Sequence, residues 1–452
     1  MAISIPAPGL LKSDDDLYRI FHEAEKPRSA WRVGTEAEKF GVVLPEASPL
    51  RYEGKEGVEG VFDALVREYG WEPLAEYDGG PSIALVREQA SITLEPGAQL
   101  ELSGAPADTI HETCREFHTH MRELKGISEA LRIAWIGLGF HPFARQADLP
   151  WVPKLRYGIM REYLPTRGSM ALDMMRRTCT VQANLDYASE ADAMRKLRVG
   201  LRASPIVTAM FANSPLVEGA RSGEASHRAL VWLHMDPDRS GMLPFAWSEK
   251  SGYRDYVEWA LDVPMFLVKR GPKVLKNTGQ TFRAFWKDGF EGERATFGDW
   301  ESHLATLFPE VRLKRTLEVR GADGQSTALT CALPALWKGL LYDDRALDAL
   351  EHTTRALTFE SAEAVRPAIA DRGLRAEYGG RPLTEWAAEI LEIAEGGLER
   401  IGDLNSHGQD ERIHLAKLKE LIERGQSPSD ALLEKLSGGG DLREGVLLHA
   451  HV

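Results

Sequence analysis

Three stretches of the sequence, residues 31–38, 180–186 and 311–320, alternate polar and apolar side chains. In a β-strand, side chains two residues apart point to the same face. The three polar faces carry carboxylates beside amide and basic groups: Glu36, Glu38, Gln182, Asn184, Asp186, Arg312, Lys314, Glu318 and Arg320. Such faces need counter-charges, and divalent cations and phosphates supply them well. The pattern therefore indicates a metal-dependent enzyme.

Each carboxylate motif also has an ordinary structural interpretation. Glu36 and Glu38 fit a solvated strand face, although their apolar neighbours indicate burial, where two adjacent carboxylates repel unless a cation lies between them. Glu95 and Glu101 fit a turn followed by an edge strand. Glu318 and Arg320 fit a surface ion pair. It is their joint presence that favours a site.

Common nucleotide and zinc motifs are missing. The sequence has no Gly-x-x-x-x-Gly-Lys-Ser/Thr, and Gly137-Leu138-Gly139 lacks the third glycine of a dinucleotide fingerprint. His111-Glu112 is not followed by a second histidine at position 115, which is Arg115. P-loop, dinucleotide and zincin classes are therefore excluded.

Composition restricts the class of protein further. The chain has 452 residues, 43% of them hydrophobic, and a formal net charge of -13. This charge argues against nucleic-acid and anionic-membrane surfaces. No apolar run reaches the roughly 18 residues of a membrane span, and Met1–Pro6 shows no signal-peptide pattern. Three cysteines without a Cys-x-x-Cys pair are typical of a reducing compartment, so we expect a cytoplasmic protein without a structural zinc.

The periodicity predicts an α+β fold. Helices are expected at 13–25, 61–69, 106–127, 197–211, 346–357, 383–401 and 413–424, and an Arg-rich helical wall at 157–177. Strands are expected at 31–38, 133–140, 180–186 and 311–320, with two strands or a hairpin at 82–103. Alternating strands favour an antiparallel sheet with one polar face. We expect one domain, residues 1–452, with a strand-rich core at about 31–345 and a helical region at about 346–452.

Several long strings resemble the plant and proteobacterial type of glutamate–cysteine ligase. They are GTEAEKFG at 34–41, LEPGAQLELSGAP at 94–106, LDMMRRTCTVQANLD at 172–186, FANSP at 211–215, GMLPF at 241–245, ALDVPM at 260–265, FPEVRLKRTLEVRGAD at 308–323 and CALPALWKGLL at 331–341. The resemblance covers roughly residues 15–345 in order. It implies a glutamine synthetase-like core, in which a curved antiparallel sheet forms a bowl lined by metal carboxylates and surrounded by helices.

The resemblance also implies a reaction. The γ-carboxylate of glutamate attacks ATP to give an acyl phosphate, and the α-amine of cysteine then displaces phosphate. The products are γ-glutamylcysteine, ADP and phosphate, the first step of glutathione biosynthesis. Two or three Mg²⁺ ions and fixed cations would neutralise the crowded anions.

Residue roles follow from the same resemblance. It implies metal ligands, listed here in chain order: Glu36, Glu38, Glu95, Glu101, Gln182 and Glu318. Glu318 and Arg320 are the expected catalytic pair, with Arg320 and Lys314 as phosphate-binding groups. Arg156 and Arg228 match positions that hold the α-carboxylate of glutamate, with Arg161 and Arg177 as alternatives.

Cys114 and Cys331 match a cysteine pair that is disulfide-bonded in the plant enzymes; two free thiols are the alternative. A second plant bridge cannot form, because its first position is Asn277 and no cysteine follows before Cys331. Cys179 is expected to be a packing residue. The expected partners are small molecules, with glutathione feedback and a monomeric or homodimeric state.

Two other functions stay open at this point. The same fold could join glutamate to a different amine, since only the acceptor pocket would differ. A non-catalytic regulatory paralogue would have lost motif carboxylates, yet all five glutamates and Arg320 are present.

Overall fold

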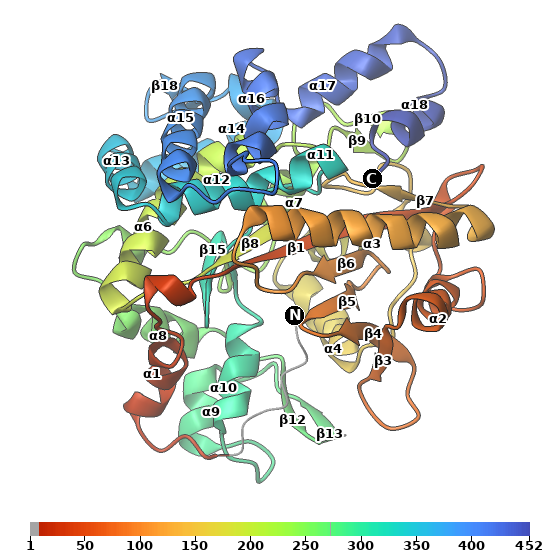
Figure 1. Ribbon diagram of the computed structural model, residues 1–452. Coiled ribbons are helices and arrows are strands. Elements are labelled where there is room, and N and C mark those ends of the chain that lie inside the picture. The colour runs from red at the N-terminus through yellow and green to blue at the C-terminus, as the bar shows by residue number, and fades with distance from the viewer. Residues whose placement is uncertain (1–8, 272) are drawn as a thin grey trace.

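The computed structural model describes residues 9–271 and 273–452, so the Met1–Pro6 segment discussed above lies outside the described residues. A large sheet crosses the middle of the molecule, and helices lie on both sides of it (Figure 1). Within the described residues, no helix is both long enough and apolar enough to span a membrane.

The main sheet is antiparallel and open. Its order is β15–β16–β8–β1–β6–β5–β4–β3, and β1 also pairs with β2 and β7. The bounds are β1 (Val33–Val43), β2 (Ser48–Pro49), β3 (Glu72–Ala75), β4 (Ser82–Arg87), β5 (Ala90–Leu94), β6 (Leu100–Ser103), β7 (Ile133–Ile136), β8 (Val181–Leu185), β15 (Val311–Leu313) and β16 (Leu317–Val319). The strand path has two free ends, so the sheet does not close into a barrel. The α+β prediction with an antiparallel sheet is confirmed.

Alternation along β1 separates the two faces of this sheet. Val33, Thr35 and Ala37 are buried, whereas Glu36 and Glu38 between them are only partly buried. A period of two is what a strand imposes on its side chains. The carboxylates therefore share one face of the sheet, as the sequence predicted.

Two strand predictions were wrong in detail. Residues 311–320 are not one strand but the hairpin β15–β16, in which Leu313 pairs with Leu317 across a three-residue turn. Because the turn has an odd number of residues, Arg312 and Glu318 still face each other. Residues 82–103 form three strands, β4, β5 and β6, since a tight turn separates β4 from β5.

Helices α3 (Ile110–Leu131) and α12 (Ala332–Leu341) pack against β1, and α12 also covers β8. Both lie on the same side of the sheet, and α15 (Leu383–Ile401) packs on α12 from outside (Figure 1). A Cβ added to Gly397 of α15 would lie 1.9 Å from the carbonyl oxygen of Gly339 in α12. Glycine at this crossing is therefore required for the two helices to approach so closely.

The remaining helices surround this core. In the first three quarters of the chain they are α1 (Asp14–His22), α2 (Val58–Tyr69), α4 (Leu155–Tyr163), α5 (Ala171–Arg177), α6 (Glu190–Met210), α7 (His227–Leu233), α8 (Tyr253–Asp262), α9 (Phe282–Asp288), α10 (Phe297–Leu304) and α11 (Thr327–Thr330). The C-terminal ones are α13 (Asp344–Thr354), α14 (Phe359–Arg372), α16 (Ala416–Glu423), α17 (Pro428–Lys435) and α18 (Leu442–His449). The structure has the predicted helices, and the assignment of the whole chain to one domain stays a prediction.

Short strand pairs complete the fold. They are β9 (Leu216–Val217) with β10 (Ala220–Arg221), β11 (Ser240–Gly241) with β14 (Phe308–Pro309), β12 (Leu267–Arg270) with β13 (Lys273–Lys276), and β17 (Glu377–Tyr378) with β18 (Arg381–Pro382). The β11–β14 pair is parallel. It brings the GMLPF string beside the start of the β15–β16 hairpin.

Candidate active site

The strand register places the predicted carboxylates side by side on the polar face of the sheet. Glu38 lies directly opposite Glu101, and Glu36 lies directly opposite Gln182. Glu318 lies opposite Asn184, next to this pair. Directly opposed residues in antiparallel strands have Cβ atoms about 4.5–5.5 Å apart. Four neighbouring strands thus bring together groups that are up to 282 positions apart in the chain, from Glu36 to Glu318.

Burial and neighbouring carboxylates raise the pKa values of Glu36, Glu38 and Glu95. The pKa of Glu38 is raised well above its ordinary value by burial and then by the charges of Glu95 and Glu101. Burial and the charges of Glu318 and Glu101 raise the pKa of Glu36, and burial with Glu101 raises that of Glu95. Their hydrogen bonds are few: Thr180 N donates to Glu38 at 2.9 Å, and Asn184 Nδ2 donates to Glu36 at 3.1 Å. This region of the face therefore has excess negative charge.

Two hydroxyl groups orient Glu101. Its carboxylate accepts hydrogen bonds from Ser103 Oγ at 2.6 Å and from Thr93 Oγ1 at 3.0 Å. Thr93 lies opposite Glu101 across β5 and β6. Burial alone would raise the pKa of Glu101, but these hydrogen bonds and the charge of Lys154 help to hold it below its ordinary value.

Glu318 has the opposite environment, because three cations surround it. Arg312 Nη2 donates to both carboxylate oxygens at 2.7 and 2.8 Å, Lys314 Nζ lies at 2.9 Å, and Arg320 Nη1 also donates to it. Burial alone would raise the pKa of Glu318, but the three cations hold it well below its ordinary value. Its charge is therefore compensated within the protein, unlike that of Glu36 and Glu38.

Arg320 joins the cationic and the acidic part of the face. Its Nη1 donates to Gln182 Oε1 at 2.8 Å as well as to Glu318. A guanidinium held by two partners on one nitrogen has a fixed orientation. Lys314 beside it is partly buried, and burial together with Arg312 lowers its pKa.

A second cationic group lies at the Glu95 end. Lys154 Nζ donates to the carbonyl of Leu94 at 2.6 Å, and the Tyr157 hydroxyl donates to the same carbonyl at 2.9 Å. Arg156 Nη2 donates to the Tyr157 hydroxyl at 3.3 Å. Burial and Arg156 lower the pKa of Lys154 to about 8, against the opposing charge of Glu95. These contacts place Arg156 beside Glu95, where the sequence predicted a substrate-binding arginine.

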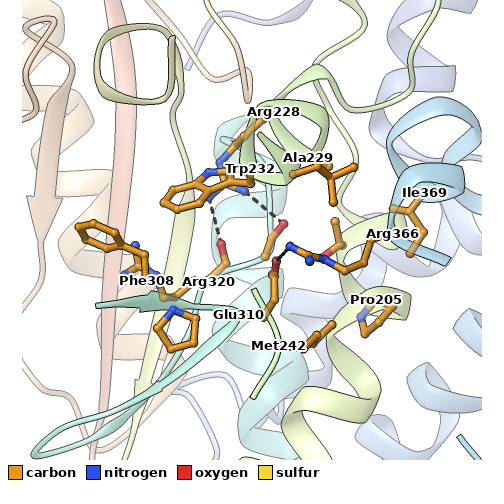
Figure 2. A pocket seen from close by; sticks show the side chains of 14 residues that line it. Pro205, Arg228, Ala229, Trp232, Met242, Phe308, Glu310, Arg320, Arg366 and Ile369 are labelled. Carbon is orange, nitrogen blue, oxygen red and sulfur yellow. Dashed lines mark hydrogen bonds and ion pairs between the residues drawn. The ribbon is translucent and has the colours of Figure 1, made fainter. Parts of the chain in front are cut away.

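Arg228 and Arg320 line the same pocket. In Figure 2, the Trp232 and Phe308 rings lie on one side of this pocket, and the ion pair between Arg366 and Glu310 lies on the other. Arg228 donates to the carbonyl oxygens of Arg320 at 3.1 Å and of Gly321 at 3.3 Å. Its Nε is buried and has no hydrogen-bond partner among the described residues. The pocket thus offers aromatic walls and two guanidinium groups to a ligand.

Arg161 and Arg177 already have protein partners. Arg177 is buried and bonds to Asp173 at 3.1 Å and to Glu218 at 3.2 Å. Arg161 is exposed, and its guanidinium lies 4.7 Å from the Trp151 ring centre. Neither lines the Arg228 pocket.

Several residues that contact the carboxylates or the adjoining backbone were given no role from the sequence. Lys154, Thr93, Ser103 and Asn184 orient the carboxylates or bind their backbone, yet each is a common polar residue in an ordinary strand or loop. The contact of Thr93 with Glu101 can be inferred only once the pairing of β5 with β6 is known. Arg312 was visible on the polar face, but its bidentate bond to Glu318 depends on the hairpin that the sequence prediction lacked.

Among the described residues, no three His, Cys, Asp or Glu side chains converge into a ready-made metal-binding group. The carboxylates are neighbours along the sheet rather than one closed cage. A bound cation would need further ligands from a substrate or from water.

Cys114 and Cys331 form a disulfide with a Cα–Cα distance of 5.8 Å. The bond joins α3 to the start of α12, behind the sheet. Cys179 is a buried free cysteine.

A family model described as glutamate–cysteine ligase family 2 matches residues 32–447. The chain is 44% identical over 416 residues to the chloroplastic glutamate–cysteine ligase of Medicago truncatula, covering 91% of this chain and 80% of the relative. It is 42% identical over 427 residues to the chloroplastic enzyme of Arabidopsis thaliana, covering 94% and 80%. The crystal structure of glutamate–cysteine ligase from Francisella tularensis in complex with AMP has the same fold, with a TM-score of 0.53 at 13% identity, covering 93% of this chain and 87% of that one.

The fold and the family match define a ligase. The chain belongs to the glutamate–cysteine ligase family. The resemblance seen in the sequence is thereby confirmed.

One expectation is corrected by the same comparison. The cysteine content predicted a cytoplasmic protein, whereas the plant relatives are named chloroplastic. The prediction was wrong because it used cysteine content, and three cysteines say little about the compartment when two of them are bonded.

Proposed function

We propose that this member of the glutamate–cysteine ligase family joins the γ-carboxyl of glutamate to the α-amine of cysteine, with ATP as co-substrate and γ-glutamyl phosphate as intermediate. The observation that carries the proposal is the arrangement of the polar sheet face. Mutually repelling carboxylates lie on one part of it and a cationic group around Glu318 lies beside them. Phosphoryl transfer needs both kinds of group. Arginine, lysine and metal cations neutralise the transferring phosphate, and carboxylates hold the metal ions in place.

The carboxylates fit Mg²⁺ as a bound ion. Glu36, Glu38, Glu95 and Glu101 supply hard oxygen donors, and the raised pKa values of the first three report charge that a divalent ion would relieve. Mg²⁺ keeps several waters and binds few carboxylates together with substrate phosphates, which suits an open row of side chains. When bound, two or three such ions would supply charge neutralisation of the phosphates. Gln182 and Glu318 are weaker candidates as ligands, since Arg320 already bonds to both.

Arg320 and Lys314 are proposed to bind the transferring phosphate. Arg320 is held by Gln182 and Glu318, so its planar group keeps one direction without reorganisation during the reaction. Lys314 adds a point charge next to it. In this proposal, Glu318 acts by orienting both cations.

Arg156 and Arg228 are proposed to hold the α-carboxylate of glutamate. Each has a buried Nε without a hydrogen-bond partner among the described residues, so each has a donor left for a ligand. Such a donor gains most when it meets a charged acceptor. Arg161 and Arg177 remain the alternatives.

The test is an activity measurement with purified protein, ATP, Mg²⁺ and glutamate. We expect ADP release to require an amine acceptor, cysteine to be the best of a panel that includes glycine, alanine, serine and 2-aminobutyrate, and the product to have the mass of γ-glutamylcysteine. A different best acceptor would identify a related glutamate–amine ligase. No ADP release with any acceptor would favour a regulatory paralogue and contradict the proposal. Glutathione inhibition and the choice between monomer and homodimer can be measured in the same preparation.

A further inference from the structure

Asp323 is a buried carboxylate that the mechanism above does not use. It lies four residues after the end of β16, is 1% exposed, and ends the RGAD string that begins with Arg320. A Cβ on Gly139 would lie 2.3 Å from its Cγ. Gly139 of the Gly-x-Gly fragment is therefore required for packing against Asp323, which explains a motif that no nucleotide site uses.

Within the part of the chain that the structure describes, the hydrogen bonds to this carboxylate all come from donors. Oδ2 accepts from Asn213 N and from Ser214 Oγ, both at 2.7 Å, and Oδ1 accepts from Ser226 Oγ at 2.9 Å. Arg228 Nη1 lies 4.0 Å away. A protonated carboxyl would place a donor against one of these donors, so the geometry suits the ionised form. Burial nevertheless raises its pKa, against the opposing influence of Arg228 and these donors.

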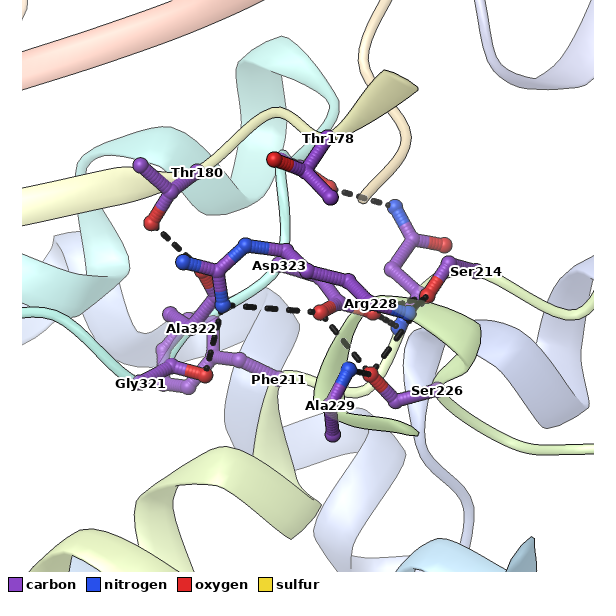
Figure 3. A network of polar contacts seen from close by, with 12 residues as sticks. Thr178, Thr180, Phe211, Ser214, Ser226, Arg228, Ala229, Gly321, Ala322 and Asp323 are labelled. Carbon is purple, nitrogen blue, oxygen red and sulfur yellow. Dashed lines mark hydrogen bonds and ion pairs between the residues drawn. The ribbon is translucent and has the colours of Figure 1, made fainter. Parts of the chain in front are cut away.

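The two serines connect Asp323 to the first turn of α7. While donating to Asp323, Ser226 Oγ accepts from Ala229 N at 3.0 Å, and Ser214 Oγ accepts from Arg228 N at 3.1 Å. Ser226 is the N-cap of α7. Figure 3 shows this network, in which residues from the 211–215, 226–229 and 320–323 segments meet around one carboxylate. Both ends of Arg228, its backbone N–H and its guanidinium, are thus tied to one group of contacts.

We propose that Asp323 is a positioning residue for Arg228, because it fixes the start of α7 and thereby the direction in which the Arg228 guanidinium meets a substrate carboxylate in the pocket. The inference rests on the proposed function of Arg228. Asp323 is not among the residues that line the pocket. It acts through Ser214 and Ser226. Each serine donates to Asp323 and accepts from a backbone N–H of α7, so the start of the helix is held in one position.

The test compares steady-state kinetics of Asp323→Asn with those of the wild type. The amide keeps the size but loses the charge and places an NH₂ group among donors. We expect the KM for glutamate to rise about 10-fold while the KM for ATP stays within about 2-fold. Ser226→Ala keeps the charge and removes one donor, so it gives a smaller rise in the same direction and remains informative if Asp323→Asn does not fold.

Asp236→Asn is the matched control, because Asp236 is also fully buried and accepts from Arg239 Nε at 2.7 Å but has no contact with Arg228. It should lower the melting temperature without changing the glutamate KM selectively. In a double-mutant cycle, Arg228→Lys should remove most of the further effect of Asp323→Asn. If Arg228→Lys raises the glutamate KM but Asp323→Asn and Ser226→Ala do not, the inference is wrong and the proposed function stands. If Arg228→Lys itself leaves that KM unchanged, the role proposed for Arg228 is wrong and the inference falls with it.

Discussion

At the residue scale, the site is governed by the difference between two kinds of glutamate. Glu318 is neutralised by three protein cations, whereas Glu36 and Glu38 face other carboxylates. Both kinds lie on one face of the sheet, on strands β16 and β1 that β8 separates. Register contributes to the difference, since Arg312 is paired with Glu318 and Glu101 with Glu38.

Arg320→Lys is expected to lower kcat by about 10–100-fold, because an ammonium cannot keep the two bonds to Gln182 and Glu318 and also present a planar fork to phosphate. ADP release at saturating substrates measures the change. Arg315→Lys is the control, since Arg315 lies in the turn of the same hairpin but is exposed and binds Glu301 and Glu23. Turnover of Arg320→Lys equal to that of the control would contradict the phosphate role.

At the element scale, the β15–β16 hairpin depends on Arg312. Arg312 is 1% exposed, and its Nη1 donates to the carbonyls of Ala305 at 3.0 Å and Leu307 at 2.9 Å while Nη2 binds Glu318. The side chain thereby joins the hairpin to the segment that follows α10. Its removal leaves a buried carboxylate with one cation fewer.

We expect Arg312→Met to lower the free energy of unfolding by about 3–5 kcal/mol, the usual cost of breaking a buried ion pair from one side. Urea denaturation measures this. Arg315→Met in the same hairpin should change it by less than about 1 kcal/mol, because that pair is exposed. Equal losses in the two variants would show that burial of the Arg312 pair does not matter.

Helix α10 carries a buried histidine that should make stability depend on pH. His303 Nε2 bonds to the carbonyl of Ala260 at 2.8 Å, and burial lowers the pKa of His303 to about 3. Below the ordinary histidine pKa of about 6.5, the unfolded chain binds a proton that the folded chain does not. The free energy of unfolding contributed by this group therefore falls as pH decreases from about 6.5 toward 3.

When the pH is lowered from about 7.5 to about 5, His303 alone should lower the free energy of unfolding of the wild type by about 2 kcal/mol. His303→Gln has no ring to titrate, so its loss of stability over the same range should be smaller by that amount. Urea denaturation at both pH values gives the comparison, with the exposed His22→Gln as control. An identical pH dependence in wild type and His303→Gln would contradict the assignment.

The sequence predicted elements well where one period lasts over many residues. The alternation of 31–38 placed Glu36 and Glu38 on one face, and β1 confirms it. It failed at 311–320, because a hairpin with a three-residue turn keeps the same alternation as a continuous strand. The bidentate bond of Arg312 to Glu318 could not be predicted, since it crosses that hairpin. The contacts of Asp323 could not be predicted from the sequence either, because they join three segments that only the fold brings together.

At the scale of the whole molecule, the disulfide ties the N-terminal half to the C-terminal helices. Cys114 and Cys331 are 217 residues apart, and the bond joins α3 to the start of α12, the two helices that cover the back of the sheet. A cross-link over so long a loop restricts the unfolded chain more than a short one does. Its contribution should therefore appear in global unfolding rather than in the geometry of the polar face.

From the loss of chain entropy in a loop of this length, the disulfide should raise the free energy of unfolding by at most about 5 kcal/mol, because measured contributions are often smaller. We expect a reductant such as tris(2-carboxyethyl)phosphine to lower the melting temperature of the wild type and of Cys179→Ala, which keeps the bond. Cys331→Ser should melt at the lower temperature with or without reductant. Differential scanning fluorimetry measures all three proteins, and mass spectrometry of unreduced peptides shows which of them carry the bond. If the reductant opens the bond in the wild type but leaves its melting temperature unchanged, the bond does not stabilise the fold. If the reductant lowers the melting temperature of Cys331→Ser as much as that of the wild type, it acts on something other than this disulfide.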